Sequence, residues 1–228
     1  MKNYPLFILF FSLLASLSCI TATNAAPNAT SDNIVDSDIT RTATTNILLL
    51  GDSISASYGM KATQGWVHLL NQKLAKQKQA YTIINASVSG ETTSGGLSRL
   101  AGILANEKVD HLLIELGGND GLRGYSPKLI KNNLLQIIAL AKSKGIAVSM
   151  MQIKITPNYG PRYNKLFEQV FNDVATASNI TLLPFFMEAV ATDKALMQAD
   201  GIHPNALAQP IIADYVEQQL NKMMTTEP

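Results

Sequence analysis

The chain has 228 residues, with 18 lysines and arginines against 17 aspartates and glutamates, three histidines and a single cysteine. A formal net charge of +1 and the absence of a basic cluster give it no electrostatic reason to seek nucleic acid or anionic lipid, so we expect neither as a partner. With Cys19 as the only cysteine, the sequence excludes a disulfide framework.

The first 26 residues have the pattern of an export signal. Lys2 is followed by an apolar stretch over residues 5–17 and then by small residues, which predicts a signal peptide cleaved near residue 26. The apolar stretch is too short and too interrupted for a membrane span, so we expect no stable membrane insertion after cleavage. We expect a periplasmic or secreted protein. Two alternatives stay open, a retained membrane anchor and a lipoprotein attached through Cys19, although the usual lipobox leucine is absent.

Residues 27–44 are rich in Thr, Ser, Asn and Asp. Such a stretch cannot bury enough apolar surface to offset the entropy of ordering it, so we predict a flexible linker. The remaining residues, 45–228, have a usual length for one domain with a sizeable core. The sequence therefore predicts a signal peptide over 1–26, a linker over 27–44 and one folded domain over 45–228.

Five apolar runs alternate with five helix-like segments along this domain. The apolar runs are nearly continuous, as in strands covered on both faces, and span 46–50, 82–85, 111–116, 146–152 and 181–183. The predicted helices span 66–77, 94–104, 127–144, 163–177 and 205–223. The third helix has the clearest limits, because Ser126 and Pro127 suit its first turn and Gly145 its end. This alternation predicts an α/β fold, with a parallel sheet and helices on both faces.

Polar residues follow three of the predicted strands. Ser53 stands in Gly-Asp-Ser-Ile after the first, Gly90 lies in a Ser-Gly-Glu turn after the second, and Asn119 stands in Gly-Gly-Asn-Asp after the third. In open parallel sheets the ligand site lies beyond the carboxyl ends of the strands. We therefore expect all three residues at one edge of the sheet.

A serine hydroxyl becomes a good nucleophile when a histidine takes its proton, and the histidine needs a third group to orient it. Asp200 and His203 are three residues apart, so one turn of chain can present both to a serine. We predict Ser53 as the nucleophile, His203 as the general base and Asp200 as the orienting acid. Such chemistry builds negative charge on a carbonyl oxygen, which donors such as a glycine N–H or an asparagine amide stabilise.

Each assignment has an alternative. Asp200 can instead cap the last predicted helix. Asp52 and Asp120 are rival orienting acids, but we expect both to bond local backbone N–H groups and hold their loops. His68 and His111 are expected to be packing or surface residues. A metal site lacks further histidine or cysteine ligands, and the glycines after the third strand do not match a nucleotide-binding fingerprint.

Four blocks in this order, GDSIS, the Gly90 turn, GGND and DGIHPN, resemble the GDSL or SGNH hydrolase superfamily. The resemblance implies a flavodoxin-like three-layer sandwich around a five-stranded parallel sheet. It carries over the triad Ser53, Asp200 and His203, and an oxyanion hole made by Ser53, Gly90 and Asn119.

The stretches ELGGNDGLRG, NYGPRYN, LLPFFME and DGIHPNALAQPIIADY are similar to the periplasmic thioesterase, protease and lysophospholipase group of that superfamily. The likeness runs over about residues 46–220 and departs from the family name only at Ile54, where the name has leucine. It implies an exported serine hydrolase of acyl thioesters, lysophospholipids and aryl or short- to medium-chain esters, which needs no cofactor or metal. We expect a monomer whose partner is a small-molecule acyl ester or thioester.

Two loops of this group border the acyl site. They correspond to residues 121–125 and 155–160, after the third and fourth predicted strands. Leu122 and Ile155 are apolar residues in otherwise polar turns, so we expect them to contact the fatty chain. Two other functions stay open, a carbohydrate O-acetyl esterase of the same superfamily and a flavodoxin-like or lipid-carrier binding module without catalysis.

Overall fold

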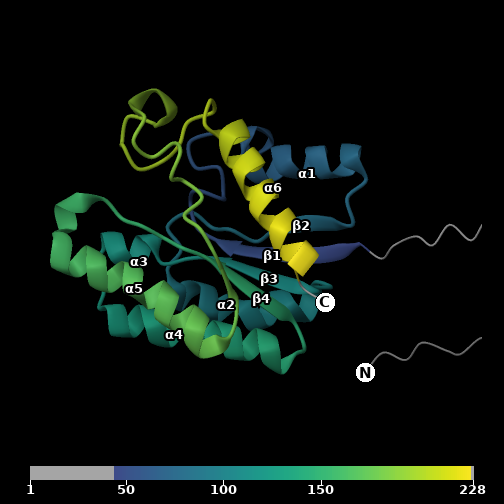
Figure 1. Cartoon of the computed structure of the whole chain (residues 1–228), viewed down its shortest axis with the longest axis horizontal. Helices are drawn as coiled ribbons and strands as arrows, with labels where there is room; N and C mark the ends of the chain where they lie inside the picture. Colours follow the sequence, from purple (N-terminus) through teal and green to yellow (C-terminus); the bar gives the residue numbers. More distant parts are fainter. Residues whose placement is uncertain (1–43, 227–228) are drawn as a thin grey trace, which may run out of the picture. The chain divides into compact units, whose positions relative to one another are not determined.

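A computed structural model describes residues 44–226 (Figure 1). The signal peptide predicted over 1–26 lies outside the described residues, as does the linker predicted over 27–44 except for Thr44. The strands are β1 (Thr45–Gly51), β2 (Tyr81–Asn85), β3 (His111–Glu115), β4 (Ala147–Met151) and β5 (Thr181–Leu183). The α-helices are α1 (Trp66–Gln77), α2 (Thr93–Asn106), α3 (Gly118–Leu122), α4 (Pro127–Ser143), α5 (Pro161–Ser178) and α6 (Gln209–Thr226).

The five strands form one parallel sheet in the order β2-β1-β3-β4-β5. The central strand β3 and its neighbour β1 are the most apolar, and residues 47–50 and 112–114 have no exposed surface. Near-continuous burial is expected of strands that helices cover on both faces. The predicted α/β fold with a five-stranded parallel sheet is confirmed.

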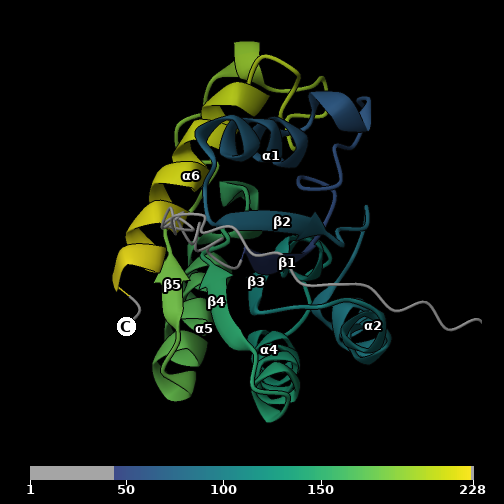
Figure 2. The same cartoon turned by 90° about the vertical axis from the view of Figure 1, so that its right-hand side faces the viewer.

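The helices lie in two layers, one on each face of the sheet (Figure 2). α1 packs against α6 on one face, while α4 packs against α2 and α5 on the other. Trp66 of α1 and the phenylalanines Phe167 and Phe171 of α5 are fully buried, and the two phenylalanine rings pack edge to face. None of the helices within residues 44–226 is long and apolar enough to cross a membrane.

Most predicted elements agree with the structure to within one or two residues at each end. α4 begins as expected, because the Ser126 side chain accepts a hydrogen bond from the Leu129 N–H and Pro127 occupies the first turn. The last helix begins four residues later than predicted, at Gln209. The reason is Asn205, whose backbone N–H and side-chain amide bond the carbonyls of Leu196 and Ala195 and hold it to the preceding turn.

The sheet order places a crevice next to β1. The chain leaves β1 for β2 on one side and later adds β3 on the other, so the direction of winding reverses between β1 and β3. Ligands of doubly wound sheets bind at this kind of switch point, beyond the carboxyl ends of the strands. β1 ends at Gly51 and β3 at Glu115, which pair side by side in the sheet.

Candidate active site

Ser53 lies on the turn that follows β1. A buried carboxylate holds this turn to the neighbouring strand: Oε2 of Glu115 accepts hydrogen bonds from the Asp52 N–H (3.2 Å) and the Ser55 hydroxyl (2.7 Å). Gly51 permits the close approach, because a Cβ atom there would lie 2.6 Å from Glu115 Oε2. The turn is therefore anchored to β3, and Ser53 keeps only 8% of its surface exposed.

Asp200 and His203 share a tight turn near the C-terminal end of the sequence, shortly before α6. Met197 and Pro204 close the turn through an antiparallel bridge, and Gly201 adopts a left-handed conformation with φ of +66°. Oδ1 of Asp200 accepts hydrogen bonds from the backbone N–H groups of Ile202 (2.9 Å) and His203 (3.0 Å). The carboxylate thus shapes the turn that carries the imidazole, and it does not cap α6.

The three residues predicted as a triad form a continuous hydrogen-bonded chain. His203 Nε2 lies 2.9 Å from Ser53 Oγ, and His203 Nδ1 lies 2.7 Å from Asp200 Oδ2. The sequence separates Ser53 from the other two by most of the domain, and the fold brings them together at the switch point. Both distances are those of direct hydrogen bonds, so a proton can pass from the hydroxyl to the imidazole.

The electrostatics of Asp200 suit an orienting carboxylate. Partial burial opposes its ionisation, but hydrogen bonds from the backbone N–H and ring of His203, and from the Ile202 N–H, outweigh that effect and lower the pKa of Asp200 to about 2. At neutral pH the group is therefore a carboxylate that can accept the Nδ1–H bond and balance a positive charge on the imidazole.

The polar donors predicted for the oxyanion lie in two neighbouring loops. The Asn119 side chain donates one amide hydrogen to Asp52 Oδ2 at 3.3 Å, which turns the nitrogen of the amide towards the Ser53 turn and leaves a second hydrogen. Gly90 has φ of +80°, and its carbonyl accepts a bond from Arg123 (3.2 Å). Among residues 44–226, nothing accepts a hydrogen bond from the backbone N–H of Ser53 or of Gly90. Both are available to a ligand.

Two buried carboxyl groups lie beneath the serine turn. Burial raises the pKa of Asp52 to about 6, although the Ile54 N–H, His203 and Asn119 act in the opposite direction. Burial also raises the pKa of Glu115 well above its usual range, and the neighbouring Asp52 adds to this effect. Asp52 bonds the local Ile54 N–H at 3.1 Å, as predicted, but it also orients Asn119.

A cavity of about 480 Å³ opens beside Ser53 and His203. These two residues, Asn119 and the Lys154–Glu188 ion pair are among the polar groups that line it, and the rest of the lining is mainly apolar. Leu122 and Ile155, predicted from the sequence to contact substrate, both line it. The apolar wall also includes Ile54, Ile153, Phe185, Phe186, Met187, Ala191, Met197 and Ile202. Such a pocket can hold an alkyl or aryl group next to the serine.

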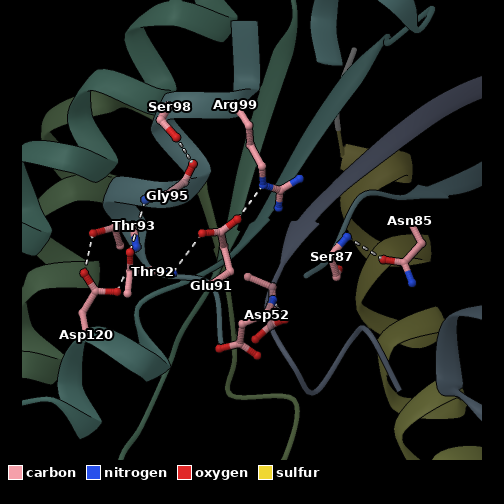
Figure 3. Close-up of polar contacts among 11 residues, drawn as sticks. Asp52, Asn85, Ser87, Glu91, Thr92, Thr93, Gly95, Ser98, Arg99 and Asp120 are labelled. Carbon is pink, nitrogen blue, oxygen red and sulfur yellow. Dashed lines mark hydrogen bonds and ion pairs between the residues drawn. The ribbon is translucent and has the colours of Figure 1, made fainter. Parts of the chain in front are cut away.

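Sequence reasoning missed several residues of the site. The Tyr58 ring packs on the His203 ring, with centroids 4.3 Å apart, and Gln198 donates to the Tyr58 carbonyl at 2.8 Å. Asp120 was expected to bond local backbone N–H groups. Its carboxylate does interact with its own backbone N–H, but it also reaches across to Thr93 at the start of α2 (Figure 3). Neither contact has a sequence signal, since each joins segments that only the fold brings together.

Comparison with known proteins shows which family the chain belongs to. The GDSL-like lipase/acylhydrolase family matches residues 49–209, a stretch that includes Ser53, Gly90, Asn119, Asp200 and His203. The chain belongs to this family. The match spans well over half of the chain and every strand of the sheet except the first residues of β1.

Individual relatives agree with the family. An arylesterase of Vibrio mimicus is 46% identical over 180 residues, which cover 79% of this chain and 90% of the relative. Thioesterase 1/protease 1/lysophospholipase L1 of Escherichia coli strain K12 is 43% identical over 182 residues, which cover 80% and 86% of the two chains. The solved structure of esterase EstA from Pseudoalteromonas sp. has a TM-score of 0.79 and 41% identity, and the match covers 80% of this chain and 100% of that one. This GDSL-family member is therefore a serine hydrolase with esterase and thioesterase relatives.

Proposed function

We propose that the protein is an exported esterase and thioesterase that forms an acyl-enzyme on Ser53. The observation that carries this proposal is the hydrogen-bonded chain from the Ser53 hydroxyl through His203 to Asp200, with distances of 2.9 and 2.7 Å. Nucleophile, base and orienting acid act together in this geometry on many unrelated folds. The apolar cavity that begins at Ser53 supplies a place for the acyl group.

Acylation begins when His203 Nε2 takes the proton of Ser53 Oγ, and the oxygen attacks the carbonyl carbon of the ester or thioester. The Asp200 carboxylate balances the charge of the imidazolium. The backbone N–H groups of Ser53 and Gly90 and the second amide hydrogen of Asn119 receive the oxyanion. The imidazolium then gives its proton to the leaving alcohol or thiol as the bond from that group to the carbonyl carbon breaks.

Deacylation repeats the same steps with water. His203 takes a proton from a water molecule as the oxygen of that water attacks the acyl carbon, and the oxyanion forms against the same donors. The bond to Ser53 Oγ then breaks, and Oγ recovers its proton from His203. The products are a carboxylic acid and the original enzyme, so these steps need no redox partner or cofactor.

The substrates that fit best are acyl thioesters, lysophospholipids and aryl or short- to medium-chain esters. The cavity wall formed by Leu122, Ile155 and their apolar neighbours favours a hydrocarbon over a carbohydrate. The names of the Vibrio mimicus and Escherichia coli relatives cover arylesterase, thioesterase and lysophospholipase activities. The signal-like pattern over residues 1–26 supports export to the periplasm or medium, and we propose that the mature enzyme is a monomer.

A fluorophosphonate probe tests the nucleophile, because it reacts covalently with an activated serine. EstA was solved inhibited by monoethylphosphonate, so a relative accepts a ligand of this kind. We expect the purified protein to be labelled and Ser53→Ala to remain unlabelled. Ser98→Ala, which removes an exposed hydroxyl on α2, is the control and should label as the unaltered protein does. Labelling of Ser53→Ala would reject the assignment.

The substrate class is tested on the same preparation. Octanoyl-CoA, a lysophosphatidylcholine and a series of p-nitrophenyl esters are compared with acetylated xylan at matched enzyme concentration. We expect turnover of the first three and little of the carbohydrate. Preferential deacetylation of xylan would favour a carbohydrate O-acetyl esterase instead. If the fluorophosphonate probe labels the protein but none of these substrates is turned over, the proposed substrate classes are wrong.

A further inference from the structure

The proposed oxyanion donors lie on separate segments. The Gly90 N–H belongs to the turn between β2 and α2, and the Asn119 amide belongs to α3, which follows β3. β1 lies between β2 and β3 in the sheet, so no hydrogen bond of the sheet joins these two strands directly. β1 fixes the ends of both strands, but the two donors lie on loops beyond those ends, so contacts between the loops also set the distance between them. An oxyanion hole works only when its donors are held ready.

A buried hydrogen-bond clamp joins the two segments. Asp120, the residue after Asn119, accepts bonds from the Thr93 backbone N–H (2.9 Å) and the Thr93 hydroxyl (2.6 Å) (Figure 3). Both residues have no exposed surface. From α4, the Asn133 amide donates to the Thr93 hydroxyl at 3.0 Å. The polar side-chain atoms of Thr93 and Asp120 are therefore hydrogen-bonded and shielded from water, which makes the geometry of the clamp stiff.

The position of the clamp suits its charge. Thr93 is the first residue of α2, a helix of 14 residues, so the Asp120 carboxyl lies at the N-terminus of that helix, where an anion is favoured. Burial raises the pKa of Asp120, and the hydrogen bonds from Thr93 act in the opposite direction. On the outer side, Arg123 bonds the Gly90 carbonyl, but Arg123 and Gly90 are both exposed. Glu91 is held in turn by Arg99 of α2 at 2.6 Å (Figure 3). The buried Thr93–Asp120 pair is thus the most sheltered link between the two loops.

We propose that Thr93 and Asp120 are positioning residues that set the separation of the Gly90 and Asn119 oxyanion donors. They do not touch substrate. They act by holding the start of α2 against α3, with Gly90 three residues before one end of the clamp and Asn119 directly before the other. The inference rests on the proposed function, in which these two donors receive the oxyanion.

The test is Thr93→Val, which keeps the size, the branching and the backbone N–H of the residue but removes the hydroxyl. We expect kcat for p-nitrophenyl butyrate to fall roughly 10- to 100-fold with little change in KM, because a small shift of one donor weakens only the transition state. Thr93→Ser restores the hydroxyl and should recover most of kcat. Asp120→Asn keeps the shape but turns one acceptor into a donor, and should lose kcat as Thr93→Val does.

The matched control is Ser98→Ala on the same helix. The Ser98 hydroxyl donates to the Gly95 carbonyl within α2, so its loss perturbs the helix without touching α3 (Figure 3). Thermal unfolding of every variant shows whether it is folded at the assay temperature, and kcat is compared only among those that are. Thr93→Val and Asp120→Asn alter opposite ends of the clamp, so either one that folds decides the question.

A double-mutant cycle with Asn119→Ala separates positioning from general damage. If the clamp acts through the donors, adding Thr93→Val to Asn119→Ala should cost much less than it costs alone. Full additivity, an unchanged kcat in folded Thr93→Val, or a rise in KM alone would overturn the inference. Ser53→Ala is measured in parallel: if it keeps activity, the proposed function fails, whereas an inactive Ser53→Ala with a fully active Thr93→Val rejects the clamp only.

Discussion

The ring of Tyr58 packs against the imidazole of His203, with centroids 4.3 Å apart and planes tilted by 32°. Gln198 links the backbones of these two residues. Its side-chain amide donates to the Tyr58 carbonyl at 2.8 Å, and its backbone N–H donates to the His203 carbonyl at 2.8 Å. The imidazole is therefore restrained by Asp200 through a hydrogen bond and by Tyr58 through a ring face. Both restraints limit rotation away from Ser53.

Tyr58→Ala should lower kcat roughly tenfold for p-nitrophenyl butyrate, because an imidazole without the ring beside it spends less time in line with Ser53. Tyr58→Phe should behave almost as the unaltered enzyme, since the contact is made by the ring and not by the hydroxyl. Steady-state kinetics on the three proteins check this. Equal kcat for the alanine and phenylalanine variants would show that the ring contact does not orient the base.

Ser53→Ala and His203→Ala should each reduce ester hydrolysis to near background, because nucleophile and base work as one unit. Their double variant should be no worse than either single variant. Thermal unfolding should change little, since neither side chain belongs to the apolar core. Hydrolysis of p-nitrophenyl acetate is the measurement, and residual activity above a few per cent in Ser53→Ala would point to another nucleophile.

Asn119→Ala should act mainly on kcat. The proposed partner of its amide is an oxyanion that exists only in the transition state, so we expect kcat to fall by roughly 10²–10³ with KM nearly unchanged. Asn119→Asp is the companion variant, because it keeps the shape but faces the oxyanion with a carboxylate, and should be at least as inactive. A strong rise in KM at constant kcat would make Asn119 a substrate-binding residue.

His111 should make the folded state sensitive to acid. Burial lowers the pKa of His111 from 6.5 to about 4, so the unfolded chain binds this proton more readily than the folded one between those values. The contribution to stability is complete above pH 6.5 and is lost as the pH falls towards 4, by about 3 kcal/mol in all. The raised pKa of Asp52 works in the opposite direction over part of this range, so the total stability curve alone does not isolate His111.

His111→Gln isolates the effect, because glutamine does not titrate but can still bond the Ser149 hydroxyl, which lies 2.8 Å from His111 Nε2. Urea unfolding at several pH values between 4 and 7.5 gives the free energy of unfolding for both proteins. The difference between them should shift in favour of the variant as the pH falls below 6.5. If the free energies of unfolding of the two proteins run parallel with pH, protonation of the buried imidazole does not destabilise the folded state.

The fold could be predicted largely from local pattern. The apolar runs at 46–50 and 111–116 are typical of buried strands, and the helix over 66–77 was placed to the residue. α3 was missed, because Gly117 and Gly118 are typical of a loop and the helix has only five residues. Its backbone is favoured by tertiary contacts, among them those of Asp120, and not by helix propensity.

The catalytic residues of the site could be predicted, because a serine, a histidine and an aspartate in a suitable arrangement point to nucleophilic catalysis. Ser53 was predicted from its place after a strand, Asp200 and His203 from their spacing of three residues, and all three from the resemblance to the GDSL or SGNH superfamily. The structure brings the three into hydrogen-bonding contact. The contact of Tyr58 with His203 and the Thr93–Asp120 pair could not be predicted, because no sequence pattern marks these residues. Their partners lie on other elements, and only the assembled sheet shows which side chains meet.

Substrate selection depends on the apolar part of the cavity. Leu122, at the end of α3, and Ile155, after β4, face the same space beside Ser53. The Tyr159 hydroxyl donates to the Leu122 carbonyl at 2.6 Å and so ties the loop after β4 to α3. Each methylene of an acyl chain that these side chains remove from water stabilises the complex by about 0.8 kcal/mol, or about fourfold in kcat/KM.

Leu122→Ala and Ile155→Ala should therefore flatten the rise of kcat/KM with acyl length between C4 and C12 p-nitrophenyl esters and leave acetate hydrolysis nearly unchanged. An acetyl group ends close to Ser53 and does not reach these side chains, whereas a longer chain loses a wall to pack against. Leu166→Ala is the matched control, because Leu166 is an exposed leucine of α5 that does not line the cavity. A uniform fall at every chain length, acetate included, would show that Leu122 and Ile155 support the serine turn and do not read the acyl chain.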